Sequence, residues 1–219
     1  MVLPTIVAVC AIFIFSYYTN LYVRVLRKRQ LMLQELIQSH VNSLLELHED
    51  ENFDTLIIGS STVRGLKGCT SFDLIGVDWM KASELEDALV RVRPTMRIKH
   101  TFVYIGVNDL IFDDTPLQIA DHIKRVCRLI AEFSENVHYI PIIVSPFQVL
   151  RRQEERIKAI NSEVARDYPS FSKIQFTLTD FKNDLLHLNH RGNTKLRKAI
   201  ERHLETIIGT RDVSPDSGM

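Results

Sequence analysis

Cysteine is scarce in this sequence, and it follows no binding pattern. Three cysteines, Cys10, Cys69 and Cys127, are spread over the 219 residues with no CxxC spacing. An odd number of widely spaced cysteines argues against a disulfide framework and against a structural zinc site. The sequence also contains no Asn-x-Ser/Thr glycosylation sequon. Neither absence indicates a secreted protein.

Net charge is absent as well, because 27 basic and 27 acidic residues cancel. A basic excess is the usual sign of a nucleic-acid partner, so we expect no nucleic-acid binding. With 45% hydrophobic and 25% charged residues, the composition is that of a globular protein. The length suits one α/β domain with an appendage and is short for two full domains.

The N-terminus is the longest apolar run. No charged side chain precedes Arg24, and the stretch through Tyr22 is just long enough to span a bilayer as a helix. We therefore predict a transmembrane anchor at residues 1–26. The basic residues from Arg24 to Arg29 would place the rest of the chain in the cytoplasm. A cleaved signal peptide, which would lead to the secretory pathway, and a buried helix of a soluble protein are the alternatives.

The next segment, residues 27–51, carries apolar residues at helical spacing, at Leu33, Ile37, Val41, Leu44 and Leu45. It is predicted to be an amphipathic helix that packs on the domain or forms a stalk. The main domain is expected at residues 52–208. Residues 209–219 are polar, contain Pro and Gly, and are predicted to form a flexible tail.

Within the domain, predicted strands and helices alternate. The strands are expected at 55–59, 100–106, 137–145 and 174–178, and the helices at 80–92, 116–133, 150–168 and 193–208. This alternation predicts a parallel sheet with helices on both faces. The predicted strands are apolar on both sides, as a sheet buried on two faces requires.

Polar clusters follow these strands, at Gly59-Ser60-Ser61, at "GVNDL" (106–110) and in the late loop "DLLHLNHRG" (184–192). Ligands of parallel sheets bind beyond the carboxyl ends of the strands. Together the clusters supply a serine, a histidine to deprotonate it, a carboxylate to orient the histidine, and oxyanion donors. The serine turn lacks the second glycine of G-x-S-x-G, which argues against that nucleophile elbow.

The blocks "IIGSSTVRG", "YIGVNDL" and "DLLHLNHRGN", in this order, resemble those of the SGNH, or GDSL-like, hydrolase family. The resemblance covers about residues 55–204, most of the domain. It implies a flavodoxin-like, three-layer α/β/α fold. It also implies a serine esterase or lipase that needs neither a metal nor an organic cofactor.

The resemblance also implies roles for individual residues. Ser61 would be the nucleophile, His187 its base and Asp184 the carboxylate behind the histidine. Ser61, Gly76 and Asn108 would form the oxyanion hole, with Gly68 as the competitor of Gly76. The substrate would be an acyl ester, either of a lipid, which a membrane anchor would suit, or an O-acetyl ester.

One position departs from the family pattern: Ser60 stands where the usual Gly-Asp-Ser has its aspartate. Ser60 is therefore also an alternative nucleophile. Arg64 is expected either to contact an anionic substrate group or to be solvated, and Trp79 to lie in the core. Asp109 is expected to act as a structural cap or turn partner.

A second function is a non-catalytic SGNH-like module that binds protein or RNA. A binding module has no need for a serine, an asparagine, an aspartate and a histidine in these positions together. Their joint presence, at Ser61, Asn108, Asp184 and His187, therefore favours the esterase.

Overall fold

The computed structural model describes residues 15–19, 21–25, 27–33, 35–36, 39, 53–67, 72–90, 97–111, 114–168 and 174–211. Outside this set lie residues 1–14 of the predicted anchor, residues 40–51 of the predicted amphipathic helix, Gly68, and residues 212–219 of the predicted tail. Among the described residues, no helix has both the length and the apolar character needed to cross a membrane.

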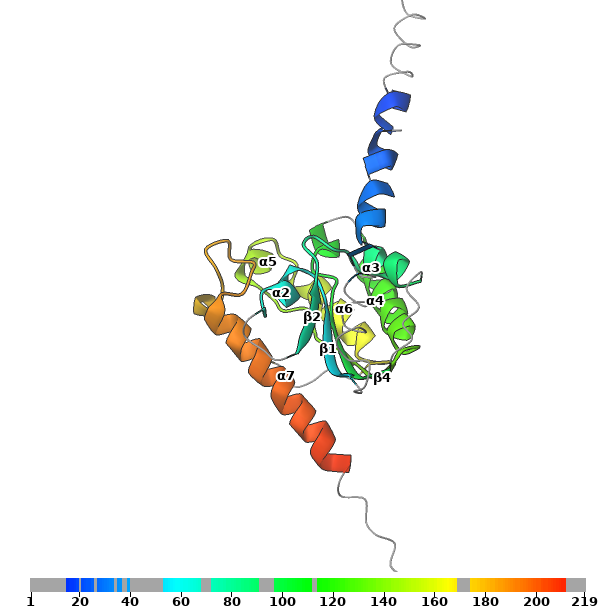
Figure 1. The fold of residues 1–219 in the computed structure, drawn as a ribbon. Helices are drawn as coiled ribbons and strands as arrows, with labels where there is room; N and C mark the ends of the chain where they lie inside the picture. The colour runs from blue at the N-terminus through cyan, green and yellow to red at the C-terminus, as the bar shows by residue number, and fades with distance from the viewer. Residues whose placement is uncertain are drawn as a thin grey trace, which may run out of the picture.

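The centre of the fold is a four-stranded parallel sheet with the strand order β2-β1-β3-β4 (Figure 1). The strands are β1 (Phe53–Gly59), β2 (Asp73–Gly76), β3 (Ile98–Tyr104) and β4 (Ser134–Tyr139). Gly59 pairs with Gly76 on one side and with Tyr104 on the other, so the carboxyl ends of three strands are level. The loops that follow these strands therefore start at one edge of the sheet.

Helices cover both faces of this sheet. The helices α3 (Ala82–Leu89), α4 (Pro116–Ile130) and α6 (Glu154–Val164) pack on one face. The helix α7 (His190–Arg211) and the short α2 (Ser61–Arg64) pack on the other. Successive residues of a strand face opposite sides, so Leu56 and Ile58 enter the first core and Ile57 enters the second. The predicted three-layer α/β/α architecture is confirmed.

Local sequence explains how the largest helix of the first layer begins. Thr115 caps α4 by accepting a hydrogen bond from the Gln118 main chain, and the Gln118 side chain accepts one from the Thr115 N–H in return. This capping box satisfies two of the donors that a helix start leaves free. Pro116, in the first turn, has no N–H to satisfy there.

One predicted strand is absent from the structure, and one observed strand was not predicted. Residues 174–177 form no regular structure, and Leu178–Asp180 form a 3-10 turn, η2, so the predicted strand at 174–178 is absent. Its apolar side chains Ile174 and Phe176 instead pack against the core beneath α7. The strand β2 was not predicted because it has only four residues, too few to show an alternation of apolar and polar side chains.

The predicted helix after the anchor packs on the domain where the structure describes it. Residues 27–33 are helical, and Leu33 is buried in the core beside α3. The Arg29 guanidinium donates to the main-chain oxygen of Trp79 (2.9 Å) and pairs with Glu84 (3.1 Å). Figure 1 shows this blue helix leaving the domain next to α3.

Candidate active site

The strand β1 ends in a glycine because the neighbouring backbone leaves no room for a side chain. A Cβ on Gly59 would lie 1.9 Å from the main-chain oxygen of Tyr104. The next residue, Ser60, donates its N–H to that same oxygen (3.1 Å). The chain then turns into α2, whose first residue is Ser61. Close packing of β1 on β3 therefore presents Ser61 at the carboxyl edge of the sheet.

A tight loop between Phe181 and Leu188 brings Asp184 and His187 to Ser61. Phe181 and Leu188 form an antiparallel bridge, and Lys182 N–H donates to the oxygen of His187 (2.8 Å). Between them, Leu185 adopts a left-handed conformation (φ 58°) and accepts a hydrogen bond from Phe147 N–H. A left-handed leucine is unusual and persists only where its surroundings fix it.

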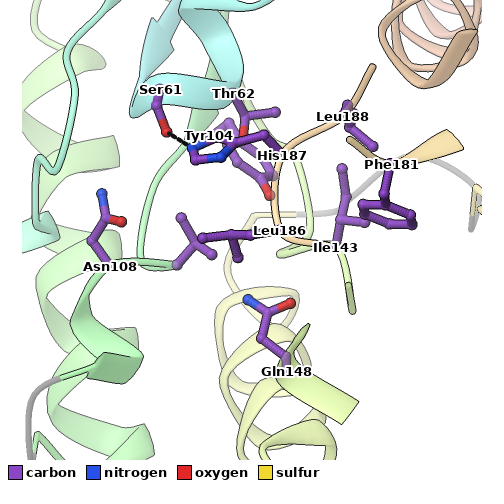
Figure 2. Close-up of a pocket in the computed structure, with 11 residues that line it drawn as sticks. Ser61, Thr62, Tyr104, Asn108, Ile143, Gln148, Phe181, Leu186, His187 and Leu188 are labelled. Atoms are coloured by element: carbon purple, nitrogen blue, oxygen red, sulfur yellow. Dashed lines mark hydrogen bonds between the residues drawn. The ribbon is translucent and has the colours of Figure 1, made fainter. Parts of the chain in front are cut away.

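Ser61, His187 and Asp184 form a continuous hydrogen-bonded chain. Ser61 Oγ lies 3.1 Å from His187 Nε2 (Figure 2). His187 Nδ1 in turn lies 2.8 Å from Asp184 Oδ2. An ionised carboxylate can only accept, so His187 Nδ1 carries the proton and Nε2 is left to accept from the serine. This is the arrangement in which a histidine can deprotonate a serine.

The Asp184 carboxylate is held in its charged form. Partial burial works against the charge, but hydrogen bonds from the main-chain N–H groups of His187 and Leu186 and from the His187 ring outweigh it. Together they lower the pKa of Asp184 to about 2. Both N–H groups bond to Oδ1 at 2.9 Å, which leaves Oδ2 to orient the histidine. The carboxylate is therefore ionised at any pH near neutrality.

Asn108 lies across the cavity from Ser61 and His187 (Figure 2). Its side chain is 5% exposed, and its Nδ2 donates to the main-chain oxygen of Met80 (3.0 Å). Two residues earlier, Gly106 has a φ of 104°, and a Cβ there would lie 2.8 Å from Ile123 Cδ1. Gly106 thus permits the turn after β3 that delivers Asn108 to the site.

Three other candidate residues from the sequence are Gly76, Gly68 and Ser60. Gly76 lines neither of the cavities at Ser61, and its oxyanion role stays a prediction. Gly68 lies outside the described residues. Ser60 is fully buried, lines neither cavity, and its hydroxyl has no hydrogen-bond partner among the described residues. Its position gives Ser60 no access to a substrate as a nucleophile.

Two cavities meet at Ser61, Asn108 and His187. The inner one is a cavity of about 10 Å³ walled by Tyr104, Ile143, Phe181, Leu186 and Leu188, among others. The outer one is an open cleft of about 400 Å³ bordered by Arg64, Asp78, Trp79 and Lys182. Ser61 thus faces a small cavity on one side and a wide cleft on the other, and both are lined by apolar and polar residues together.

The remaining candidates have structural or rim positions. Arg64 is 63% exposed and pairs with Asp78 (2.6 Å) at the rim of the outer cleft. Asp109 accepts from the Ala82 N–H and so caps α3, in line with its expected structural role. Asn189 Nδ2 donates to the main-chain oxygens of Thr179 and Phe181 and so braces the loop.

Trp79 is the main surprise at the site. It was expected in the core, but it is 61% exposed and borders the outer cleft. The sequence did not indicate its position at the cleft because Trp79 comes only three residues after the short β2, which was not predicted. The inner walls Tyr104 and Ile143 were missed for another reason: apolar strand ends look the same whether they line a cavity or a core. Within the described residues, no cluster of histidine, cysteine or acidic residues could hold a metal ion.

The sequence matches no protein-family model and no curated protein. Solved structures do match. A Streptococcus pneumonia protein, provisionally described as a platelet activating factor, gives a TM-score of 0.61 at 20% identity, over 84% of this chain and 99% of that one. A GDSL-like lipase from Bacteroides thetaiotaomicron gives 0.55 at 11% identity, over 70% and 88%. A variant acetyl xylan esterase from Geobacillus stearothermophilus gives 0.53 at 11% identity, over 69% and 94%. The chain therefore has the fold of the SGNH, or GDSL-like, hydrolases.

Proposed function

We propose that this protein is a serine hydrolase that cleaves a carboxylic ester. The observation that carries the proposal is the hydrogen-bonded chain from Ser61 Oγ through His187 to the Asp184 carboxylate. The fold shared with lipases and esterases supports the same reaction class, although fold alone does not establish function.

The proposed reaction has two halves. Ser61 Oγ attacks the ester carbonyl while its proton passes to His187 Nε2, and a tetrahedral oxyanion forms. The carbon–oxygen bond to the alcohol then breaks, and the alcohol leaves with the proton from His187. Water, deprotonated by His187, attacks the acyl-serine, and the carboxylic acid leaves as Ser61 takes back the proton.

The oxyanion needs donors that are fixed before the reaction. We assign this role to the main-chain N–H of Ser61 and to the Asn108 side chain. One hydrogen of Asn108 Nδ2 is used by the Met80 oxygen, which anchors the amide, and the second remains for the substrate. Gly76 remains the proposed third donor on the resemblance alone.

The test is labelling and hydrolysis with the full chain. A fluorophosphonate probe should label the protein, and p-nitrophenyl acetate should be hydrolysed. Ser61→Ala should abolish the labelling, and both Ser61→Ala and His187→Ala should lower kcat by roughly a thousandfold or more. Ser60→Ala is the matched control and should retain both signals. An unlabelled, inactive wild type would contradict the proposal and favour a binding module.

We further propose that residues 1–26 attach the protein to a membrane, with the domain in the cytoplasm. The support is the uncharged N-terminal sequence and the basic residues after it. Within this segment, helical residues expose the side chains of Phe15, Tyr17, Tyr18 and Tyr22, aromatic residues of the kind that suits a membrane interface.

A further inference from the structure

The inner cavity at Ser61 has a buried hydrogen-bond donor that the proposed reaction does not use. The donor is Nε2 of Gln148, a residue of α5 (Pro146–Leu150) that lines the cavity. Building on the esterase function proposed above, we propose that this amide binds an oxygen atom of the substrate's acyl group. The protein thereby selects the ester of a short acid that carries an oxygen beyond its carboxyl group, such as a hydroxy acid.

One end of the Gln148 amide is fixed by the backbone. The Ser145 N–H donates to Gln148 Oε1 at 2.6 Å, and the Gln148 N–H donates in return to the Ser145 hydroxyl at 3.4 Å. A backbone N–H can only donate, so the amide atom that faces it is the oxygen. The other atom is therefore Nε2, which carries two hydrogens. Figure 2 shows the Gln148 side chain reaching from its helix toward the other residues that line the cavity.

The Nε2 atom has no partner of its own in the protein. Gln148 is 2% exposed, and its Nε2 makes no hydrogen bond to any residue that the structure describes. A buried donor without a partner is unfavourable, and such groups are rare in folded proteins. A ligand oxygen in the cavity would satisfy this donor.

Helix capping does not explain the amide nitrogen. Gln118 forms the same capping box with Thr115 at the start of α4, but Gln118 is exposed and its Nε2 can bond to water. In both boxes the cap uses Oε1, which a glutamate side chain supplies equally well. The Gln148 amide differs because its nitrogen side belongs to the cavity that Ser61 and His187 also line.

The other polar side chains at the inner cavity already have partners or roles. They are Ser61, Thr62, Tyr104, Asn108 and His187. The Tyr104 hydroxyl is hydrogen-bonded to the Ile143 main chain and to the Thr62 side chain. Ser61 and His187 react, and Asn108 is assigned to the oxyanion. Gln148 Nε2 is thus the donor that remains for a further atom of the substrate.

The acyl group is the half of the ester that takes this cavity. The alcohol has to leave before water attacks the acyl-serine, and the outer cleft of about 400 Å³ gives it the wider way out. The acyl group stays on Ser61 beside the inner cavity of about 10 Å³, which has room for about one water-sized group. A hydroxyl group has this size, and its oxygen can accept from Gln148 Nε2.

The test uses two pairs of p-nitrophenyl esters in which a hydroxyl replaces a methyl group. The pairs are glycolate with propionate and 3-hydroxypropionate with butyrate. For the full chain, kcat/KM of the hydroxy ester is divided by that of its partner, and the ratio is corrected for their rates of hydrolysis by hydroxide. The corrected ratio should reach about ten in at least one pair, the factor that one added hydrogen bond contributes.

Two variants remove the donor in different ways. Gln148→Met keeps the length of the side chain without its polar atoms, and Gln148→Glu, once ionised, keeps an acceptor for the Ser145 N–H but has no donor. Each should lower the corrected ratio by about tenfold, and measuring both esters on the same protein cancels any loss of folded enzyme. Gln118→Glu, the same exchange in the exposed capping box, is the control and should leave the ratio unchanged.

A wild-type ratio near one in both pairs, or a ratio that neither Gln148 variant lowers, would overturn the proposal. These failures can be told from failure of the enzyme function. A protein that reacts with the fluorophosphonate at Ser61 but shows no preference for the hydroxy esters has lost only the acyl-group assignment. A protein that neither reacts with the probe nor hydrolyses any ester has lost both.

Discussion

Both carboxylate oxygens of Asp109 accept the main-chain N–H of Ala82, at 3.1 and 3.0 Å. Asp109 directly follows Asn108, and Ala82 begins α3, so one side chain ties the Asn108 loop to the helix beside the outer cleft. The carboxylate is 1% exposed. Burial, only partly opposed by the N–H donors, raises the pKa of Asp109 to about 6.

This raised pKa predicts a stability gain in mild acid. Between its unfolded pKa near 4 and about 6, the folded state binds the Asp109 proton more tightly than the unfolded state does. Its contribution to the free energy of unfolding should therefore rise by about 1.5 kcal/mol from pH 8 to pH 5. Asp109→Asn cannot titrate, so in urea unfolding its free energy of unfolding should fall by about 1.5 kcal/mol more than that of the wild type from pH 8 to pH 5. Asp121→Asn, on the exposed side of α4, is the control and should follow the wild type.

His138 should contribute in the opposite direction. Both of its ring nitrogens face other histidines, His100 Nδ1 at 3.1 Å and His203 Nε2 at 3.4 Å. Burial, followed by repulsion from His203 and His100, lowers the pKa of His138 to about 4. The neutral ring stabilises the fold fully above the unfolded pKa of about 6.5, and this contribution is lost as the pH falls toward 4.

The measurement is again urea unfolding. From pH 8 to pH 5, this histidine should lower the free energy of unfolding of the wild type by about 2 kcal/mol. In His138→Gln, this loss should disappear, and the gain from Asp109 should become visible. If His138→Gln and the wild type lose stability in parallel, His138 is not the responsible group.

Local patterns in the sequence predicted most of the fold and the candidate catalytic residues. An apolar run that stops at Gly59 predicts a strand and a sharp turn, because that signal depends only on neighbours in the chain. Asp184 and His187 are close for the same reason, because they are only three positions apart in the sequence. Ser61 lies near this pair because parallel strands end at the same edge of the sheet, and the alternation of strands and helices predicted a parallel sheet.

What could not be predicted depends on packing between distant segments. The inner cavity is closed by residues of β3, the loop after β4 and the loop before α7, and no local pattern reports its size. Trp79 was placed in the core because tryptophan usually packs there, whereas contact with Arg29 holds its backbone at the surface. The apolar run at 174–178 was assigned to a strand, although packing under α7 accounts for it equally well.

Gly106 should tolerate no side chain. At φ 104° any other residue is strained, and a Cβ would lie 2.8 Å from Ile123 Cδ1. Gly106→Ala should lower the free energy of unfolding by about 2–3 kcal/mol. It should also lower kcat, since Asn108 lies two residues away. Gly65→Ala is the comparison: its φ of −64° is helical, and a Cβ there would lie 3.2 Å from Asn193 Nδ2 and from the Thr62 oxygen, so it should cost less stability than Gly106→Ala.

Membrane attachment is tested by fractionation of the full chain. The wild type should stay with membranes through an alkaline carbonate wash, because an uncharged apolar segment is held by the hydrophobic effect and not by charge. Deletion of residues 1–26 keeps Arg29 and Leu33, which pack on the domain, and should release a folded protein. A wild type that is recovered in the soluble fraction would contradict the anchor.

Asp184→Asn gives the sharpest test of the hydrogen-bonded chain. The substitution keeps the shape, and Asn Oδ1 can still accept from Leu186 and His187 N–H. Its Nδ2, however, donates where Oδ2 accepted, so His187 must turn Nδ1 into an acceptor and put its proton on Nε2. That nitrogen then cannot deprotonate Ser61, and kcat should fall by about 10⁴.

Stability separates this effect from a damaged loop. The charged Asp184 is partly exposed, and its main-chain hydrogen bonds survive in the variant, so the melting temperature near neutral pH should move only slightly. Asp121→Asn is the control for loss of a surface carboxylate and should leave kcat unchanged. A variant that melts like the wild type and keeps its kcat would show that Asp184 does not orient His187. The hydrolysis would then have to proceed without the carboxylate.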